Sequence, residues 1–141
     1  MQLSPHFTVE EFTRSATAVR LGIDNTPVEQ QVRNLYLLCK NVLEPARELF
    51  GKPIIVSSGF RCYELNAAVG GKPTSYHLRG LAADLQTQDP NDLRPLFDIL
   101  RKQHRFDRLL YERNKQGTQW IHVQYRPDGK NCRYVNDNYR A

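Results

Sequence analysis

The 141-residue sequence has few cysteines and no long apolar run. Its three cysteines are an odd number at wide spacing, so they form neither a CxxC motif nor a disulfide framework. No stretch approaches the roughly 18 apolar residues of a membrane span. A basic arm that binds nucleic acid would contain a run of five or more lysines and arginines, and no such run is present. These absences favour a globular protein with reduced thiols, which fits synthesis in the cytoplasm.

Length and composition indicate one domain over residues 1–141. A chain of this length buries a core without disulfides, and 40% hydrophobic with 25% charged residues is an ordinary mix. The net charge of +5 favours anionic partners, such as nucleic acid or the bacterial wall. Because the basic residues are scattered, we expect no nucleic-acid partner. A monomer is the default expectation.

Two helix starts lie in the first third of the chain. Thr8 and Glu11 form a capping box for a short helix. The polar segment 14–25 predicts a loop. Thr26 predicts the cap of a longer helix, whose apolar residues recur at helical spacing until Gly51. Pro45, inside this pattern, is expected to kink its last turns.

The rest of the chain predicts mainly strands with two further helices. Strands are expected at 54–58, 81–85, 106–112 and 120–125, and an edge strand at 133–135. Helices are expected at 62–69 and from an opening at 89–92 to residue 100. The polar segment 113–119 predicts a hairpin loop. The fold class is therefore α+β, with a small, mainly antiparallel sheet that carries the site and with helices covering its other face.

The segment from His77 to Asp84 has the form HxxGxAxD. Histidine and aspartate are natural ligands of Zn²⁺, and Gly80 lets the loop bend so that His77 can fold back toward the strand. A further histidine, His122, shares a strand face with Trp120 by alternation. His77, Asp84 and His122 are therefore our predicted metal ligands. Three protein ligands with one open position are typical of catalytic zinc.

A lone histidine is more often structural or exposed than a ligand. We assign His6 and His104 in that way, because neither has a partner motif and His104 follows a helix end, where a positive charge is favoured.

Several motifs together resemble one family, the zinc D-Ala-D-Ala metallopeptidases (peptidase family M15, subfamily A), in the short single-domain branch common in phage and prophage genomes. The similar segments are 7–12, 55–61, Asn66, 69–71, 75–84 and 120–123. The resemblance implies a hedgehog/D-Ala-D-Ala peptidase-like fold, with zinc held by His77, Asp84 and His122. It also implies substrate-binding roles for Arg61 and Ser75.

The two substrate-binding roles have alternatives. A guanidinium binds a peptide carboxylate through two parallel hydrogen bonds, but Arg61 could instead form a surface ion pair. Ser75 could bond the substrate backbone or only stabilise its own loop.

The general base is the one departure from the family pattern. Many relatives place an acid three positions before the last histidine, where this chain has Gln119, which cannot exchange a proton. Glu112, at the end of the preceding strand, is our predicted base, and its alternative role is a strand-end ion pair. Asp107 is the weaker candidate.

The expected function is zinc-dependent hydrolysis of an amide bond in peptidoglycan stem peptides, as a carboxypeptidase or an endolysin-like endopeptidase. The alternatives are a non-catalytic zinc- or wall-binding module and a virion or morphogenesis component. Met1 to His6 lack the features of a secretory signal. We therefore expect synthesis in the cytoplasm and action on the wall after release through a holin-type pore, after lysis, or in a virion.

Overall fold

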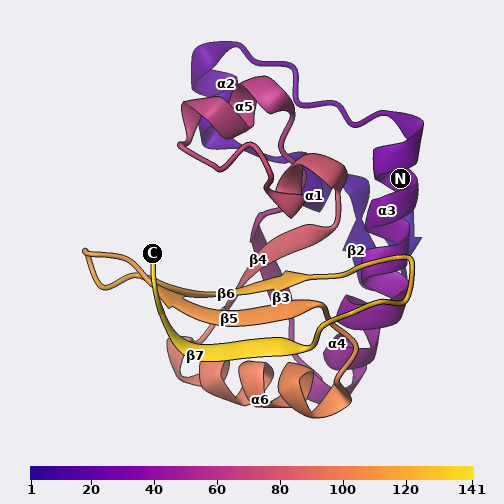
Figure 1. The fold of residues 1–141 in the computed structure, drawn as a ribbon, viewed down its shortest axis with the longest axis vertical. Helices are drawn as coiled ribbons and strands as arrows, with labels where there is room; N and C mark the ends of the chain where they lie inside the picture. Colours follow the sequence, from indigo (N-terminus) through magenta and orange to yellow (C-terminus); the bar gives the residue numbers. More distant parts are fainter.

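The computed structural model describes residues 1–141 and has the predicted α+β fold (Figure 1). The strands are β1 (Gln2–Ser4), β2 (Phe7–Thr8), β3 (Ile54–Ser58), β4 (Ala82–Thr87), β5 (Arg108–Arg113), β6 (Gln119–Gln124) and β7 (Tyr134–Arg140). β1 and β2 form a small sheet, and the other five form a sheet in the order β3-β4-β6-β5-β7. Every pair is antiparallel except β5 with β7, so the sheet is mainly antiparallel, as predicted.

Helices pack against one face of the larger sheet, and further helices lie above its strands in Figure 1. They are α1 (Val9–Thr13), α2 (Ala16–Leu21), α3 (Glu29–Leu38), the π-helical segment η1 (Cys39–Leu43), α4 (Glu44–Phe50), α5 (Tyr63–Ala68), the 3₁₀ segments η2 (Tyr76–Arg79) and η3 (Pro90–Asp92), and α6 (Leu93–Gln103). No helix combines the length and the apolar character that crossing a membrane requires.

The first helix forms as predicted, but the loop expected over 14–25 is partly helical. The Thr8 hydroxyl and the Glu11 carboxylate complete the capping box of α1. In the next segment, the Ser15 hydroxyl caps α2, and Gly22 ends α2 in the left-handed conformation. The loop prediction was wrong because α2 buries only Ala18, and so it leaves no apolar periodicity to detect.

The long helix begins two residues later than its predicted cap allows. Thr26 donates its hydroxyl and backbone N–H to Asp24 in a turn before the helix, and the backbone N–H of Val28 donates to the Gln31 side chain. The predicted Thr26 cap is therefore wrong. Pro45 is the second residue of α4, which begins directly after η1, where one wider turn replaces the regular helix. Proline supplies no N–H to the helix, and such a widened turn accommodates it.

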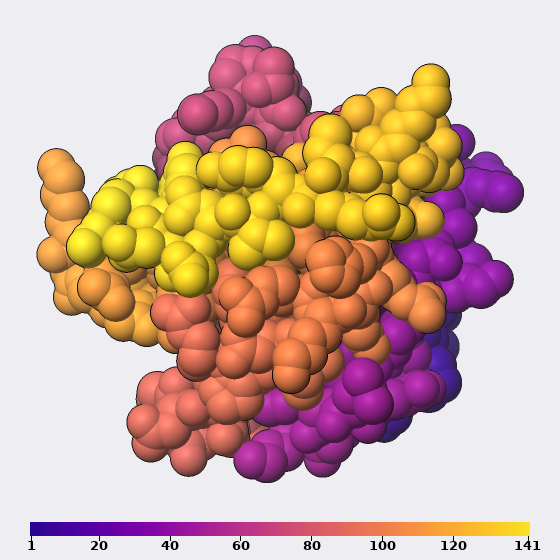
Figure 2. All heavy atoms as spheres, turned by 60° about the horizontal axis from the view of Figure 1, so that its bottom comes forward, coloured from indigo at the N-terminus to yellow at the C-terminus, as the bar shows by residue number.

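Alternation along the central strands separates a core face from a polar face. Residues on the core face pack against the helices and are almost fully buried: Ala83, Leu85, Leu109, Tyr111, Ile121 and Val123. The intervening residues Asp84, Glu112 and His122 point to the opposite face. β7 is longer than the predicted edge strand, and its chain (yellow in Figure 2) lies along the outer edge of the sheet beside β5.

Candidate metal centre

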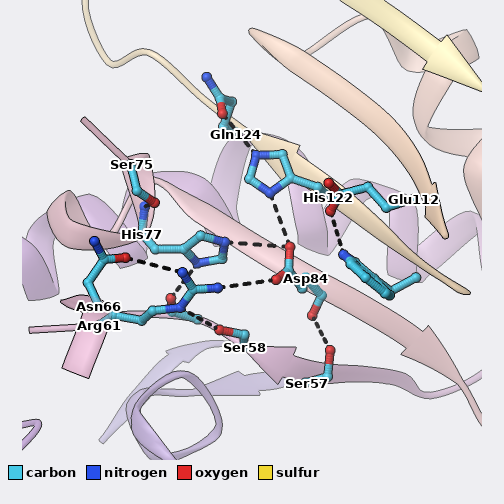
Figure 3. Close-up of polar contacts among 12 residues, drawn as sticks. Ser57, Ser58, Arg61, Asn66, Ser75, His77, Asp84, Glu112, His122 and Gln124 are labelled. Atoms are coloured by element: carbon cyan, nitrogen blue, oxygen red, sulfur yellow. Dashed lines mark hydrogen bonds and ion pairs between the residues drawn. The ribbon is translucent and has the colours of Figure 1, made fainter. Parts of the chain in front are cut away.

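His77, Asp84 and His122 converge on the polar face of the sheet (Figure 3). One potential ligand atom from each residue lies within 4.8 Å of the other two. Nε2 of His77 is 3.5 Å from Oδ1 of Asp84, and Nδ1 of His122 is 3.0 Å from the same oxygen. The structure thus brings together the three residues that the sequence predicts as metal ligands.

Strand register and one sharp turn account for this convergence. Asp84 on β4 is the direct antiparallel partner of His122 on β6. His77 lies in η2, which ends at Gly80 with φ +73°. A β-carbon at Gly80 would lie 2.7 Å from the backbone oxygen of Gln31 in α3. Only glycine fits this turn without strain, and the turn returns the chain from η2 to the start of β4.

Hydrogen bonds outside the cluster determine which ring nitrogens carry protons. Nδ1 of His77 lies 2.7 Å from the carbonyl oxygen of Gly59. A carbonyl can only accept, so Nδ1 donates and Nε2 is the nitrogen that faces Asp84. The Gln124 amide donates to Asp107 and turns its oxygen to Nε2 of His122. His122 therefore donates from Nε2 to Gln124, and its Nδ1 faces Asp84, to which it donates when the ring is protonated.

The cluster is largely shielded from solvent. The side chains of His77, Asp84 and His122 are 4%, 14% and 14% exposed. Burial opposes the ionised form of Asp84, but the charges and hydrogen bonds of the two histidines outweigh it and hold its pKa well below the usual range. Burial likewise opposes a charge on His122, yet the hydrogen bond and charge of Asp84 raise the pKa of that imidazole.

The donor set fits a divalent metal. Two imidazole nitrogens, which offer lone pairs once their protons leave, and one ionised carboxylate match the ligands and the number of protein donors at catalytic zinc sites. The partners of the two histidines are of the kind that orients metal-bound imidazoles. His77, Asp84 and His122 therefore form a cluster that could hold a metal ion.

Glu112 lies on the same face as the cluster and borders the same cavity. This cavity of about 320 Å³ is lined by both Glu112 and His122. The Glu112 carboxylate accepts a hydrogen bond from the indole N–H of Trp120, its partner across the hairpin. Burial, followed by the negative charge of Asp84, raises the pKa of Glu112 above its ordinary value, as suits a proton-transfer group.

Gln119 lies on the opposite face of β6. Its side-chain oxygen accepts a hydrogen bond of 2.9 Å from the Tyr111 hydroxyl, and Tyr111 belongs to the core face. Because β6 is regular from Gln119 to Gln124, a residue three positions before His122 points away from the cluster. An acid at position 119 would not reach the site in this chain.

Arg61 and Ser75 both line the cavity. The Arg61 guanidinium donates from Nε to Ser58 at 3.1 Å and from Nη1 to Asn66 at 3.2 Å, and its Nη2 lies 3.6 Å from Asp84 (Figure 3). Burial lowers the pKa of Arg61, against the charge of Asp84. The Ser75 hydroxyl accepts from the backbone N–H of His77, so it stabilises its own loop, one of its two expected roles, at the edge of the cavity.

The remaining candidates lie outside the cluster. Asp107 accepts from the Cys132 backbone and from Gln124 and does not line the cavity. His6 bonds Glu44 at 2.6 Å, and His104 ends α6 in the left-handed conformation.

Sequence reasoning missed the contacts that Gly59 and Gln124 make with the two histidines and the place of Arg108 on the cavity wall. Alternation with His122 places Gln124 on the site face, but its contact with Asp107 depends on tertiary structure. Arg108 lies four residues before Glu112, so strand alternation could have placed it on the cavity wall.

A comparison with known families agrees with this geometry. A family model described as Peptidase M15 matches residues 5–124. The match spans the three clustered residues, Glu112, Arg61 and Ser75, and it ends before β7. No curated protein matches the chain.

Proposed function

Because the chain belongs to the peptidase M15 family, we propose that it is a zinc peptidase that hydrolyses an amide bond in bacterial peptidoglycan stem peptides. We further place it in subfamily A, in the short branch common in phages and prophages. It would reach the wall after release through a holin-type pore, after lysis, or as part of a virion. The observation that carries the proposal is the convergence of His77, Asp84 and His122 beside a cavity that also contains Glu112.

The metal-binding role belongs to the three clustered residues. His77 would bind through Nε2, His122 through Nδ1, and Asp84 through its carboxylate, since these are the atoms that face one another. A bound zinc ion would polarise the scissile carbonyl and make a water molecule a nucleophile near neutral pH.

Glu112 would transfer the proton. An ionised Glu112 takes a proton from the attacking water and then donates it to the leaving amine. Its position on the cavity wall and its raised pKa suit both steps, because a base with a pKa nearer neutrality also returns its proton more readily. The hydrogen bond from Trp120 fixes the carboxylate on the β5–β6 hairpin.

Arg61 would bind a substrate carboxylate. Its contacts with Ser58 and Asn66 hold the guanidinium in a fixed orientation on the cavity wall, and stem peptides carry the carboxylates that a guanidinium binds well. Ser75 would contact the substrate backbone at the same wall.

The test is mass spectrometry of muropeptides released from purified peptidoglycan. We expect the zinc-loaded protein to release peptide fragments, a chelator to stop the release, and added zinc to restore it. The masses identify the bond and separate carboxypeptidase from endopeptidase activity. Glu112→Gln should bind zinc normally and release nothing. Binding to peptidoglycan without any cleavage by the zinc-loaded protein would overturn the proposal in favour of a wall-binding module.

A further inference from the structure

Arg108 projects from β5 into the wall of the same cavity. It lies on the face of β5 that also carries Glu112, and both residues line the cavity together with Arg61 and His122. Its neighbours in register are Gln124 on β6 and Tyr134 on β7. Neither the metal cluster nor the proposed proton transfer uses this residue.

The guanidinium of Arg108 is held in place without a hydrogen bond or a close ion pair. It lies over the ring of Tyr134, with its central carbon 4.9 Å from the ring centroid. Its charge acts on Glu112 only at longer range, where it favours the ionised carboxylate. Stacking on an aromatic ring orients a guanidinium while leaving the N–H groups at its edge free. By contrast, Arg61 is bonded to Ser58 and Asn66.

The charges around the cavity favour an anionic ligand group. Its lining contains three cationic side chains, Arg61, Lys72 and Arg108, and one carboxylate, that of Glu112. Asp84, beneath the cavity, is already hydrogen-bonded to His122. Because the Arg108 guanidinium is oriented by the Tyr134 ring and not by a hydrogen bond, it retains donors for a carboxylate that comes from outside the protein.

We propose that Arg108 is a specificity-determining residue that binds a carboxylate of the peptide substrate, separately from Arg61. The inference rests on the proposed peptidase function and names the feature of the substrate that the site selects: an acidic stem peptide rather than its amidated form. Tyr134, which orients Arg108, lies beyond residues 5–124, the part of the chain that matches the family. The stacked arrangement is therefore built partly by a segment outside the matched region.

The experiment compares kcat/KM for three stem peptides of one sequence. One carries all its carboxylates, one has the α-carboxyl of its D-glutamate amidated, and one has its C-terminal carboxyl amidated. For the wild-type protein we expect one of the two amidations to lower kcat/KM about 10- to 100-fold, as expected for loss of a charge-assisted hydrogen bond. Arg108→Gln should lower kcat/KM for the unamidated peptide by the same factor, and in this variant that amidation should lower kcat/KM no further.

Two variants serve as controls. Arg105→Gln removes an exposed arginine outside the cavity and should leave all three values unchanged. Arg108→Lys keeps the charge but not the planar fork, so it should recover part of the discrimination. Thermal unfolding of Arg108→Gln should stay close to the wild type, because the stacking on Tyr134 lies at the edge of the sheet and Tyr134 is itself exposed.

The outcomes separate the two proposals. Wild-type cleavage of all three peptides with unaltered discrimination by Arg108→Gln would overturn the role of Arg108 alone. A zinc-loaded wild-type protein that cleaves none of the peptides, nor purified peptidoglycan, would overturn the peptidase function and the role of Arg108 with it.

Discussion

His122 and Gln124 are joined by a hydrogen bond of 2.9 Å between Nε2 of the ring and the amide oxygen. The Gln124 amide nitrogen donates in turn to Asp107 at 3.1 Å, which fixes the orientation of the amide. Asp107 is itself held by the Cys132 backbone. This chain of contacts keeps a proton on Nε2 of His122, so that Nδ1 is the nitrogen available to a metal once the proton shared with Asp84 has left.

Replacing Gln124 should therefore weaken zinc binding. We expect Gln124→Leu to lower zinc affinity about 10- to 100-fold, because the ring loses the acceptor that sets its tautomer. Competition titration with a chromophoric chelator measures the affinity. Gln119→Leu, on the other face of the same strand, is the matched control and should keep wild-type affinity. Equal affinity of Gln124→Leu and wild type would contradict the orienting role.

Replacing Glu112 should separate catalysis from metal binding. We expect Glu112→Gln to lower kcat about 10²- to 10⁴-fold, the usual contribution of a positioned acid–base group. KM and zinc affinity should change little, because Glu112 is not part of the clustered ligand set. Steady-state kinetics on a stem peptide provide the values. Substantial activity in this variant would assign the proton transfer to another group.

Zinc binding should strengthen as the pH rises. The pKa of His122 is raised above its ordinary value, because the hydrogen bond and charge of Asp84 outweigh the effect of burial, so zinc competes with a proton at neutral pH. We expect the affinity to rise from pH 6 through the folded-state pKa of His122 and then level off. A chelator competition series across this range would show it, with His104→Gln as a control that should keep the profile. An affinity independent of pH would contradict a protonated His122 in the metal-free protein.

The stability of the metal-free protein should change in the opposite direction. A raised pKa of His122 in the folded state stabilises the fold below the unfolded value of about 6.5, and this contribution is lost as the pH rises through the folded value. We therefore expect the melting temperature of the metal-free protein to fall between pH 6.5 and 9. The variant His122→Asn should flatten this decline. A wild-type melting temperature that rises over the same pH range would contradict a stabilising protonated His122.

The metal cluster was predictable because its signals are local. His77, Gly80 and Asp84 occupy one short motif. Because the apolar Ile121 and Val123 face the core, strand alternation places His122 on the opposite face. The face of Glu112 follows from the hairpin register between β5 and β6. The positions of these residues could be predicted without knowing how distant segments pack.

The rest depends on contacts between distant segments. The role of Gln124 requires Asp107, whose position is fixed by the Cys132 backbone. The environment of Arg108 requires the parallel pairing of β7 with β5, whereas the sequence predicts only a three-residue edge strand. The short helix α2 was missed because it carries a cap at each end but no apolar stripe.

The approach of Gly80 to α3 should make the turn before β4 sensitive to any added side chain. Gly80 and Gly117 both have positive φ, at +73° and +85°, so alanine at either costs about 1–2 kcal/mol of conformational energy. A β-carbon would meet the Gln31 oxygen at 2.7 Å at Gly80 but nothing within 4 Å at Gly117. Gly80→Ala should therefore lower the free energy of unfolding by about 1 kcal/mol or more beyond Gly117→Ala. Urea unfolding of the metal-free variants measures this difference, and a zinc titration should show weaker binding for Gly80→Ala alone, because the clash displaces the turn that carries His77. Equal losses in both variants would show that the left-handed conformation, and not the contact with Gln31, is what requires glycine at position 80.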